Sequence, residues 1–270
     1  MKVHGMLGLI ILLIIGSVSG YFSTKAWGTG WGITCAIAAF LLAYLILSLI
    51  LRSLVMRRQM VIQNIMQDAQ NKVNRQLEMF NRRPPSSVNA ARQMLEKIQF
   101  DAIRKALVEL EGFKKFYIWS VMLVRQINTM KIQLHYQLRE YSKVDELLPK
   151  ALLFDPQSLA IKLARMYKNN DPKLDKFYKF KCSRLKGENG AFVASVYAWI
   201  KIKQSEPEKA LEALRAAAKT SDHMVLRENI DRLVNGKIKH YSNSGFGDTW
   251  YVLALEEPKV KNQRQQMRAF

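Results

Sequence analysis

Two uncharged apolar stretches at the start of this chain, residues 5–24 and 26–51, constrain its fold more than any other feature. Lys25 is the single charge between them. A helix rises 1.5 Å per residue, so about 20 residues cover the roughly 30 Å hydrocarbon core of a bilayer. We therefore expect residues 1–55 to form a transmembrane helical hairpin that anchors the rest of the chain.

The basic residues that flank these stretches predict the orientation of the hairpin. Arg52, Arg57 and Arg58 follow the second stretch, whereas the connection between the two stretches carries only Lys25. Cytoplasmic flanks of membrane helices carry an excess of Lys and Arg. This positive-inside bias predicts an integral membrane protein with both ends of the hairpin, and the soluble domain, in the cytoplasm.

A cleaved signal peptide is the alternative for the first stretch. Lys2 would be its basic region, residues 6–15 its apolar region, and residues 17–19 a small-residue cleavage site. The uncharged run continues past Ser19 to Thr24, which favours the hairpin. Gly16 and Gly20 give the first helix a small-residue face, which we expect to pack against the second helix.

The charge of the chain indicates an anionic partner. All 22 acidic residues and 39 of the 42 basic residues follow residue 55, so this part carries a net charge of +17. Anionic lipid head groups are a possible partner, because such membranes attract basic segments. Nucleic acid is the less favoured alternative, since the bases are interleaved with acids and no nucleic-acid-binding motif is present. One basic run lacks acids, the tail with Lys259, Lys261, Arg264 and Arg268.

The rest of the chain has helical periodicity and no sustained period-two alternation, which predicts an all-α fold. We expect a polar stalk helix and a Pro-rich break over residues 56–86, a helical-repeat domain over 87–241, and a C-terminal cap with the basic tail over 242–270. The predicted helices of the repeat domain are 87–112, 116–138, 141–153, 157–167, 173–185, 191–203 and 207–219.

The C-terminal apolar block, residues 249–255, follows a turn-rich break. It is short enough to be a helix or a strand, and we favour a helix that caps the repeat domain. A segment that docks on a partner is the alternative.

Small and aromatic residues recur in the repeat domain at fixed places. Ala210 and Ala217 follow Glu206-Pro207, and Ala198 lies in the preceding predicted helix. Tyr141 and Ala151 match the same second-helix pattern in an earlier segment, which we expect Asp155-Pro156 to end. Ala151 and Ala217 are 66 residues apart, close to twice a period of 34. Residues 115–220 thus resemble the tetratricopeptide (TPR) superfamily, which implies an α-solenoid of helical hairpins. A two-helix anchor before such repeats is similar in layout to HemY-type inner-membrane proteins of bacteria, which implies that location.

The sequence offers no motif for catalysis. The four histidines have no metal-ligand spacing, and neither a phosphate-binding glycine loop nor a nucleophile elbow is present. We therefore expect no enzyme activity, cofactor or metal. The favoured function is a membrane-anchored helical-repeat scaffold that binds another protein at the cytoplasmic face. The alternatives are a lipid- or nucleic-acid-binding protein driven by the basic surface, and an accessory subunit of a larger membrane complex.

Overall fold

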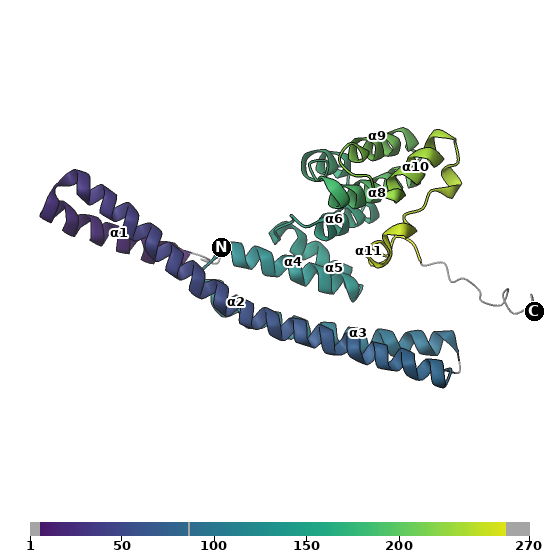
Figure 1. Cartoon of the computed structure of the whole chain (residues 1–270), viewed down its shortest axis with the longest axis horizontal. Coiled ribbons are helices and arrows are strands. Elements are labelled where there is room, and N and C mark those ends of the chain that lie inside the picture. The colour runs from purple at the N-terminus through teal and green to yellow at the C-terminus, as the bar shows by residue number, and fades with distance from the viewer. Residues whose placement is uncertain (1–5, 86, 258–270) are drawn as a thin grey trace, which may run out of the picture. The chain divides into compact units, whose positions relative to one another are not determined.

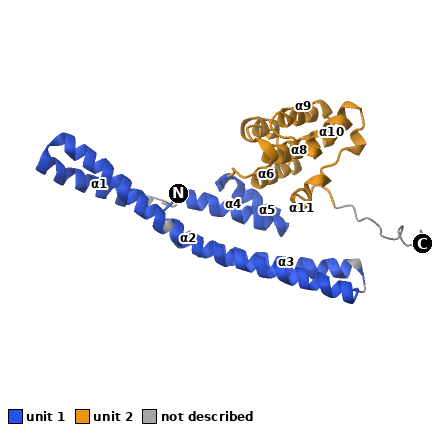
Figure 2. Ribbon diagram, viewed as in Figure 1, with its two compact units in different colours: residues 1–152 blue, residues 153–270 orange. Residues whose placement is uncertain are grey.

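A computed structural model of the chain describes residues 6–85 and 87–257, and over these residues the protein is all-helical, without a strand (Figure 1). The chain divides into two compact units, Met1–Leu152 and Leu153–Phe270 (Figure 2). This division differs from the predicted domain limits, because residues 87–152 belong to the same unit as the apolar N-terminal segment.

The first unit begins with an antiparallel helical hairpin. Helix α1 (Met6–Trp27) and the long helix α2 (Thr29–Arg82) are joined at Gly28, whose φ of 91° suits a residue without a side chain. Both helices are long and apolar enough to cross a membrane. Their apolar side chains are largely exposed, for example 66% for Phe22 and 65% for Leu42, so they do not form the core of a water-soluble domain.

The two helices of the hairpin approach each other closely at small residues. A Cβ atom on Gly20 would lie 2.9 Å from the Cβ of Ala36, and one on Gly16 would lie 3.4 Å from the Cβ of Phe40. The prediction that the small-residue face of the first helix packs on the second helix is therefore confirmed. A side chain at Gly20 would push the helices apart, whereas at Gly16 a methyl group would make ordinary van der Waals contact.

Helix α2 continues without a break from the apolar stretch into the predicted stalk and ends before Pro84. Helix α3 (Val88–Glu111) begins after Ser87, whose side chain accepts a hydrogen bond from the Ala90 N–H at 3.1 Å. It runs back alongside α2 (Figure 1). We call α3 and the part of α2 from residue 52 onward the arm. Buried residues of the arm are Ile62, Ala69, Val73, Ala102, Ile103, Ala106 and Leu110.

The chain after the arm forms η1 (Gly112–Phe116), α4 (Val121–Gln137), α5 (Tyr141–Leu147) and η2 (Leu148–Lys150). The predicted helix over 141–153 is wrong in its length, because Pro149 lacks the backbone N–H that a continuing helix needs. One apolar core joins η1, the turn after it and α4 to the arm. Its buried residues are Ile62, Ala106, Leu110, Phe113, Tyr117, Leu123 and Ile127.

The second unit is built from short helices. The predicted helix over 157–167 is confirmed within one residue at each end. Asp155-Pro156, expected to end the preceding helix, instead begins this one: the Asp155 side chain accepts the Ser158 N–H at 2.8 Å, and Pro156 takes the first helical position. The predicted helix over 173–185 is instead a short α-helix followed by a π-helical turn, and the predicted break near Gly187 is a helix start. The elements are α6 (Pro156–Lys168), α7 (Leu174–Phe177), η3 (Tyr178–Cys182), α8 (Gly187–Lys203), α9 (Pro207–Ala218) and α10 (Met224–Val234).

Helix α8 is the centre of this unit. Every residue from Gly190 to Lys201 is buried, and α6 and α9 pack against it. The segment that follows α10 also packs on α8 and consists of η4 (Ile238–His240), η5 (Ser244–Phe246) and α11 (Asp248–Tyr251). The rings of Trp199 and Trp250 meet edge to face at 5.7 Å. The C-terminal apolar block, left open as helix or strand, is therefore a short helix followed by turns that bury Trp250 and Leu253.

Candidate functional site

A pocket of about 730 Å³ in the first unit is lined by α1, α2 and the start of α4. Apolar side chains make most of its wall, among them Leu9 of α1, Leu41 and Leu47 of α2, and Met122 of α4. Its volume falls within the range of about 300–1,000 Å³ that is typical of small-molecule sites. The pocket is thus large enough for a ligand and suited to one with an apolar part.

The three arginines predicted to flank the membrane differ in their surroundings. Nη1 of Arg58 lies 3.7 Å from Oε2 of Glu109, and its guanidinium carbon lies 6.0 Å from the centre of the Phe113 ring. Arg58 therefore links α2 to α3 and η1. Arg57 is exposed and lies outside the pocket. Arg52 is exposed and lines the pocket. Among the described residues, neither Arg52 nor Arg57 has an acidic partner.

The turn before α4 forms one wall of the pocket and was missed by the sequence analysis. A Cβ on Gly8 would lie 2.8 Å from the backbone oxygen of Trp119, so this turn lies directly against α1. Ile118 and Met122 nearby are exposed. The aromatic and basic residues over 113–119 could have indicated that this turn lies at a membrane interface, since aromatic rings and Lys or Arg gather there. The predicted helix over 116–138 included residues 116–119, whereas the observed helix α4 begins only at Val121.

The residues predicted to pack repeats are only partly brought together. Ala198 of α8 and Ala210 of α9 are fully buried in one cluster with Leu214 and Leu226, and Ala217 packs against this cluster while partly buried. All of these lie in the second unit. Tyr141 and Ala151 lie in the first unit.

Tyr141 and Ala151 do not have the surroundings that the repeat pattern implies. Tyr141 is partly buried and meets the ring of Tyr136 edge to face at 5.3 Å. Ala151 lies after η2 in extended backbone, with φ −98° and ψ 166°, and is not part of a helix. Ala151 is therefore not a helix-crossing position, because Pro149 ends α5 before reaching it.

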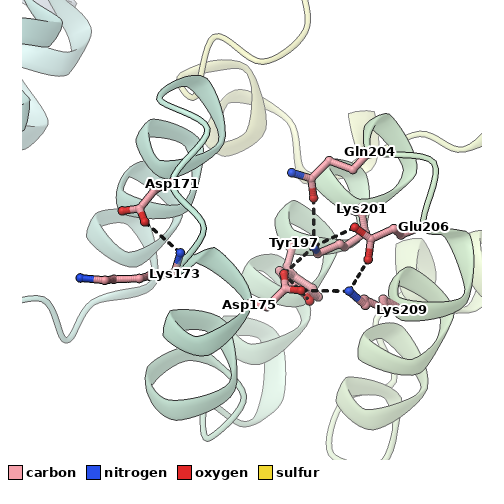
Figure 3. A network of polar contacts seen from close by, with 8 residues as sticks. All are labelled: Asp171, Lys173, Asp175, Tyr197, Lys201, Gln204, Glu206 and Lys209. Atoms are coloured by element: carbon pink, nitrogen blue, oxygen red, sulfur yellow. Dashed lines mark hydrogen bonds and ion pairs between the residues drawn. The ribbon is translucent and has the colours of Figure 1, made fainter.

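The second unit contains a polar network at the junction of α7, α8 and α9 (Figure 3). Lys201 is only 3% exposed, and its Nζ lies 2.5 Å from Oδ1 of Asp175 and donates to Gln204 at 2.9 Å. Lys209 donates to the other oxygen of Asp175 at 3.1 Å and also pairs with Glu206. Two lysines thus face two carboxylates, and the network is neutral.

The electrostatics of the network hold Asp175 in its ionised form. Burial by itself raises the pKa of this carboxyl group, but hydrogen bonds from Lys201, Lys209 and Tyr197 outweigh burial and leave the pKa below its usual value. Burial raises the pKa of Tyr197, whose ring stacks on Tyr178 with centroids 3.8 Å apart. Because each charge has a partner of opposite sign, we interpret the network as a structural link between three helices and not as a reactive centre.

The other residues that the sequence singled out do not form a ligand site among the described residues. The basic tail residues Lys259, Lys261, Arg264 and Arg268 lie outside the residues that the structure describes. Within the described ranges, no three His, Cys, Asp or Glu side chains are grouped closely enough to hold a metal ion. The two cysteines are free thiols, and burial raises the pKa of Cys182 to about 12. The pocket beside Arg52 is therefore the strongest candidate for ligand binding.

Comparison of the chain with protein-family models, curated proteins and solved structures finds no match in any of the three.

Proposed function

We propose that this protein is a membrane-anchored helical scaffold that binds another protein at the cytoplasmic face of a bacterial inner membrane. Two N-terminal helices with exposed apolar side chains support the anchor. The positive flank at Arg52, Arg57 and Arg58 supports the orientation. The buried alanines of the α8–α9 hairpin support a TPR-like packing in the second unit.

The main support for the proposal is that α2 continues as one helix from the apolar stretch into the arm. From residue 52 to Arg82 the helix extends about 45 Å beyond the apolar stretch. The end of the arm holds three exposed apolar side chains, Leu77, Met79 and Met94, the last two each 52% exposed. Methionine adapts to differently shaped partners and is frequent on protein-binding surfaces. A partner that buries these side chains would remove apolar area from water.

The end of the arm is a better partner surface than the face of α8. In a repeat solenoid the first helix of each hairpin lines the concave ligand face. Here the segment 238–257 covers α8, with Trp250 and Leu253 fully buried against the unit. A ligand at this face would first have to displace the chain's own C-terminal segment.

Photo-crosslinking in intact membranes tests the proposal. A photoreactive residue replaces Met79 or Met94 in the full chain, and Asn71, exposed on α2, is the matched control. We expect the same discrete protein adduct from positions 79 and 94 and none from 71. Absence of a protein adduct at both methionines would contradict the scaffold function. A reporter fused after residue 270 tests the orientation separately, and activity of a reporter that requires export would reverse it.

Anionic-lipid binding through the basic surface is the second candidate, favoured by the net charge of +17 after residue 55. The full chain in nanodiscs of neutral lipid should then recruit anionic vesicles at low salt and release them as salt rises. Equal recruitment of neutral vesicles would contradict an electrostatic mechanism. Retention of single-stranded RNA instead would favour the nucleic-acid alternative.

A further inference from the structure

The pocket beside Arg52 lies where the apolar stretch of α2 ends and the charged arm begins. We propose that it binds an anionic membrane phospholipid, with an acyl chain along the apolar wall and the phosphate on Arg52. This inference rests on the membrane insertion of α1 and α2 in the proposed function, but not on the protein partner. A site of this kind would hold one lipid per chain, unlike diffuse attraction to a charged surface.

The shape and lining of the pocket favour an acyl chain. Leu9, Leu41 and Leu47 come from the two helices that would lie in the bilayer, and Trp119 and Met122 come from the turn and helix packed beside them. A membrane surrounds such a pocket with lipid at high concentration. Its apolar wall would stabilise a hydrocarbon chain but would contribute nothing to binding a free phosphate ion.

The charges at the pocket favour an anionic head group. Arg52 is the one charged side chain among the described residues that line it, and no carboxylate there would repel a phosphate. Its guanidinium has no acidic partner among the described residues. Arginine binds phosphate through two parallel N–H donors, and Gln126 of α4, which also lines the pocket, carries a side-chain amide donor. Basic pockets between membrane helices near the cytoplasmic side bind lipid head groups in this way.

The head-group half of the proposal is tested with two arginine variants. The full chain is delipidated in a neutral detergent and titrated with phosphatidylglycerol or with phosphatidylcholine of the same acyl chains, and bound lipid is counted by native mass spectrometry. We expect one tightly held phosphatidylglycerol per chain and a preference over phosphatidylcholine of about tenfold. Arg52→Gln should abolish the preference. Arg57→Gln, five residues further along the same helix, should retain it because Arg57 lies outside the pocket.

The acyl-chain half is tested with a matched pair of leucine variants. Leu41 lines the pocket and Leu42 does not, and both side chains are exposed, so neither substitution disturbs a packed core. Leu41→Trp should place a bulky ring in the path of the acyl chain and lower the bound lipid at least about tenfold, whereas Leu42→Trp should bind as the native chain does. Glycerol phosphate, which has the head group but no acyl chain, should not compete.

Each of the following results would overturn the proposal. The native chain retains no phosphatidylglycerol, or Arg52→Gln and Arg57→Gln weaken the preference equally, which would indicate diffuse surface charge. Leu41→Trp binds lipid like Leu42→Trp, which would place the acyl chain elsewhere. Glycerol phosphate displaces the lipid at equal concentration, which would indicate an anion site without an acyl-chain pocket. Loss of the scaffold's protein adduct would leave all of these results unchanged, so the two proposals fail separately.

Discussion

The indole N–H of Trp199 donates a hydrogen bond to Oε1 of Glu256 at 2.6 Å, across 57 residues of sequence. The indole of Trp250 donates to the other oxygen of the same carboxylate at 3.2 Å. One carboxylate therefore joins the central helix α8 to the segment that closes the second unit. Tyr241 and Asn243 reinforce this contact, since both donate to the backbone oxygen of Ser195 on α8.

Replacing Glu256 with alanine should destabilise the second unit. Both indole donors would lose their acceptor, and hydrogen bonds to a charged group each contribute about 1.5–3 kcal/mol. We expect a loss of about 2 kcal/mol, because Glu256 is only partly buried. Tryptophan fluorescence during urea unfolding measures it. Glu257→Ala, an exposed neighbour, is the control and should change stability by less than about 0.5 kcal/mol. Equal effects of the two variants would exclude a specific role for the carboxylate.

Asp175 should make the stability of the second unit depend on pH on the acid side. Its pKa in the folded protein lies below its ordinary value, so the ionised carboxylate stabilises the fold. This contribution is complete above the unfolded pKa of about 3.9 and is lost as the pH falls through the lower folded value. Unfolding of Asp175→Asn followed between pH 5 and pH 2 should show a shallower loss of stability than the native chain. Parallel curves would show that the network does not depend on this charge.

A bulky residue at Gly20 should weaken the α1–α2 hairpin. The Cβ alone would lie 2.9 Å from the Cβ of Ala36, so Gly20→Leu must separate the helices, at a cost of about 1–3 kcal/mol. Thermal unfolding of the full chain in detergent measures the loss. Gly30→Ala is the control, since a Cβ there meets no atom within 4 Å. An unchanged midpoint for Gly20→Leu would show that the hairpin does not pack as described.

Ala210→Leu should overpack the crossing of α8 and α9. Ala210 has no exposed surface and lies in the cluster with Ala198 and Leu214, so added volume costs about 1–3 kcal/mol. Ala216→Leu on the exposed face of the same helix should be nearly neutral. Ala217, which is partly buried, should tolerate the same change better than Ala210 does. Chemical unfolding of the three variants gives the order, and a neutral Ala210→Leu would remove the basis for a TPR-like crossing.

The features predicted correctly from the sequence are those that local patterns determine. The apolar runs predict two long helices, Pro84 and Pro85 mark the end of α2, and a small-residue face predicts where the hairpin packs. Local patterns predicted the wrong helix boundary where the same residues are compatible both with the end of one helix and with the start of the next. Asp155-Pro156 both follows the α5 region and begins α6, because aspartate caps a helix N-terminus and proline suits its first position.

The candidate site could not be predicted because it depends on contacts between distant residues. Gly8 lies against the backbone of Trp119, 111 residues away, and both residues line the pocket beside Arg52. The same holds for the polar network, in which Lys201 meets Asp175 across 26 residues. A single sequence contains the aromatic and basic residues of these sites, but periodicity does not say which of them meet.

Helix α2 carries the candidate membrane span and the arm in one continuous helix, so under the proposed membrane insertion the two would tilt together. A membrane helix changes its tilt when the thickness of the surrounding bilayer changes. Because α2 is helical through residues 51–52, a tilt of about 10° would move the end of the arm sideways by about 8 Å over its length of about 45 Å. The distance between the bilayer and whatever contacts Met79 and Met94 would then report the local thickness and composition of the membrane.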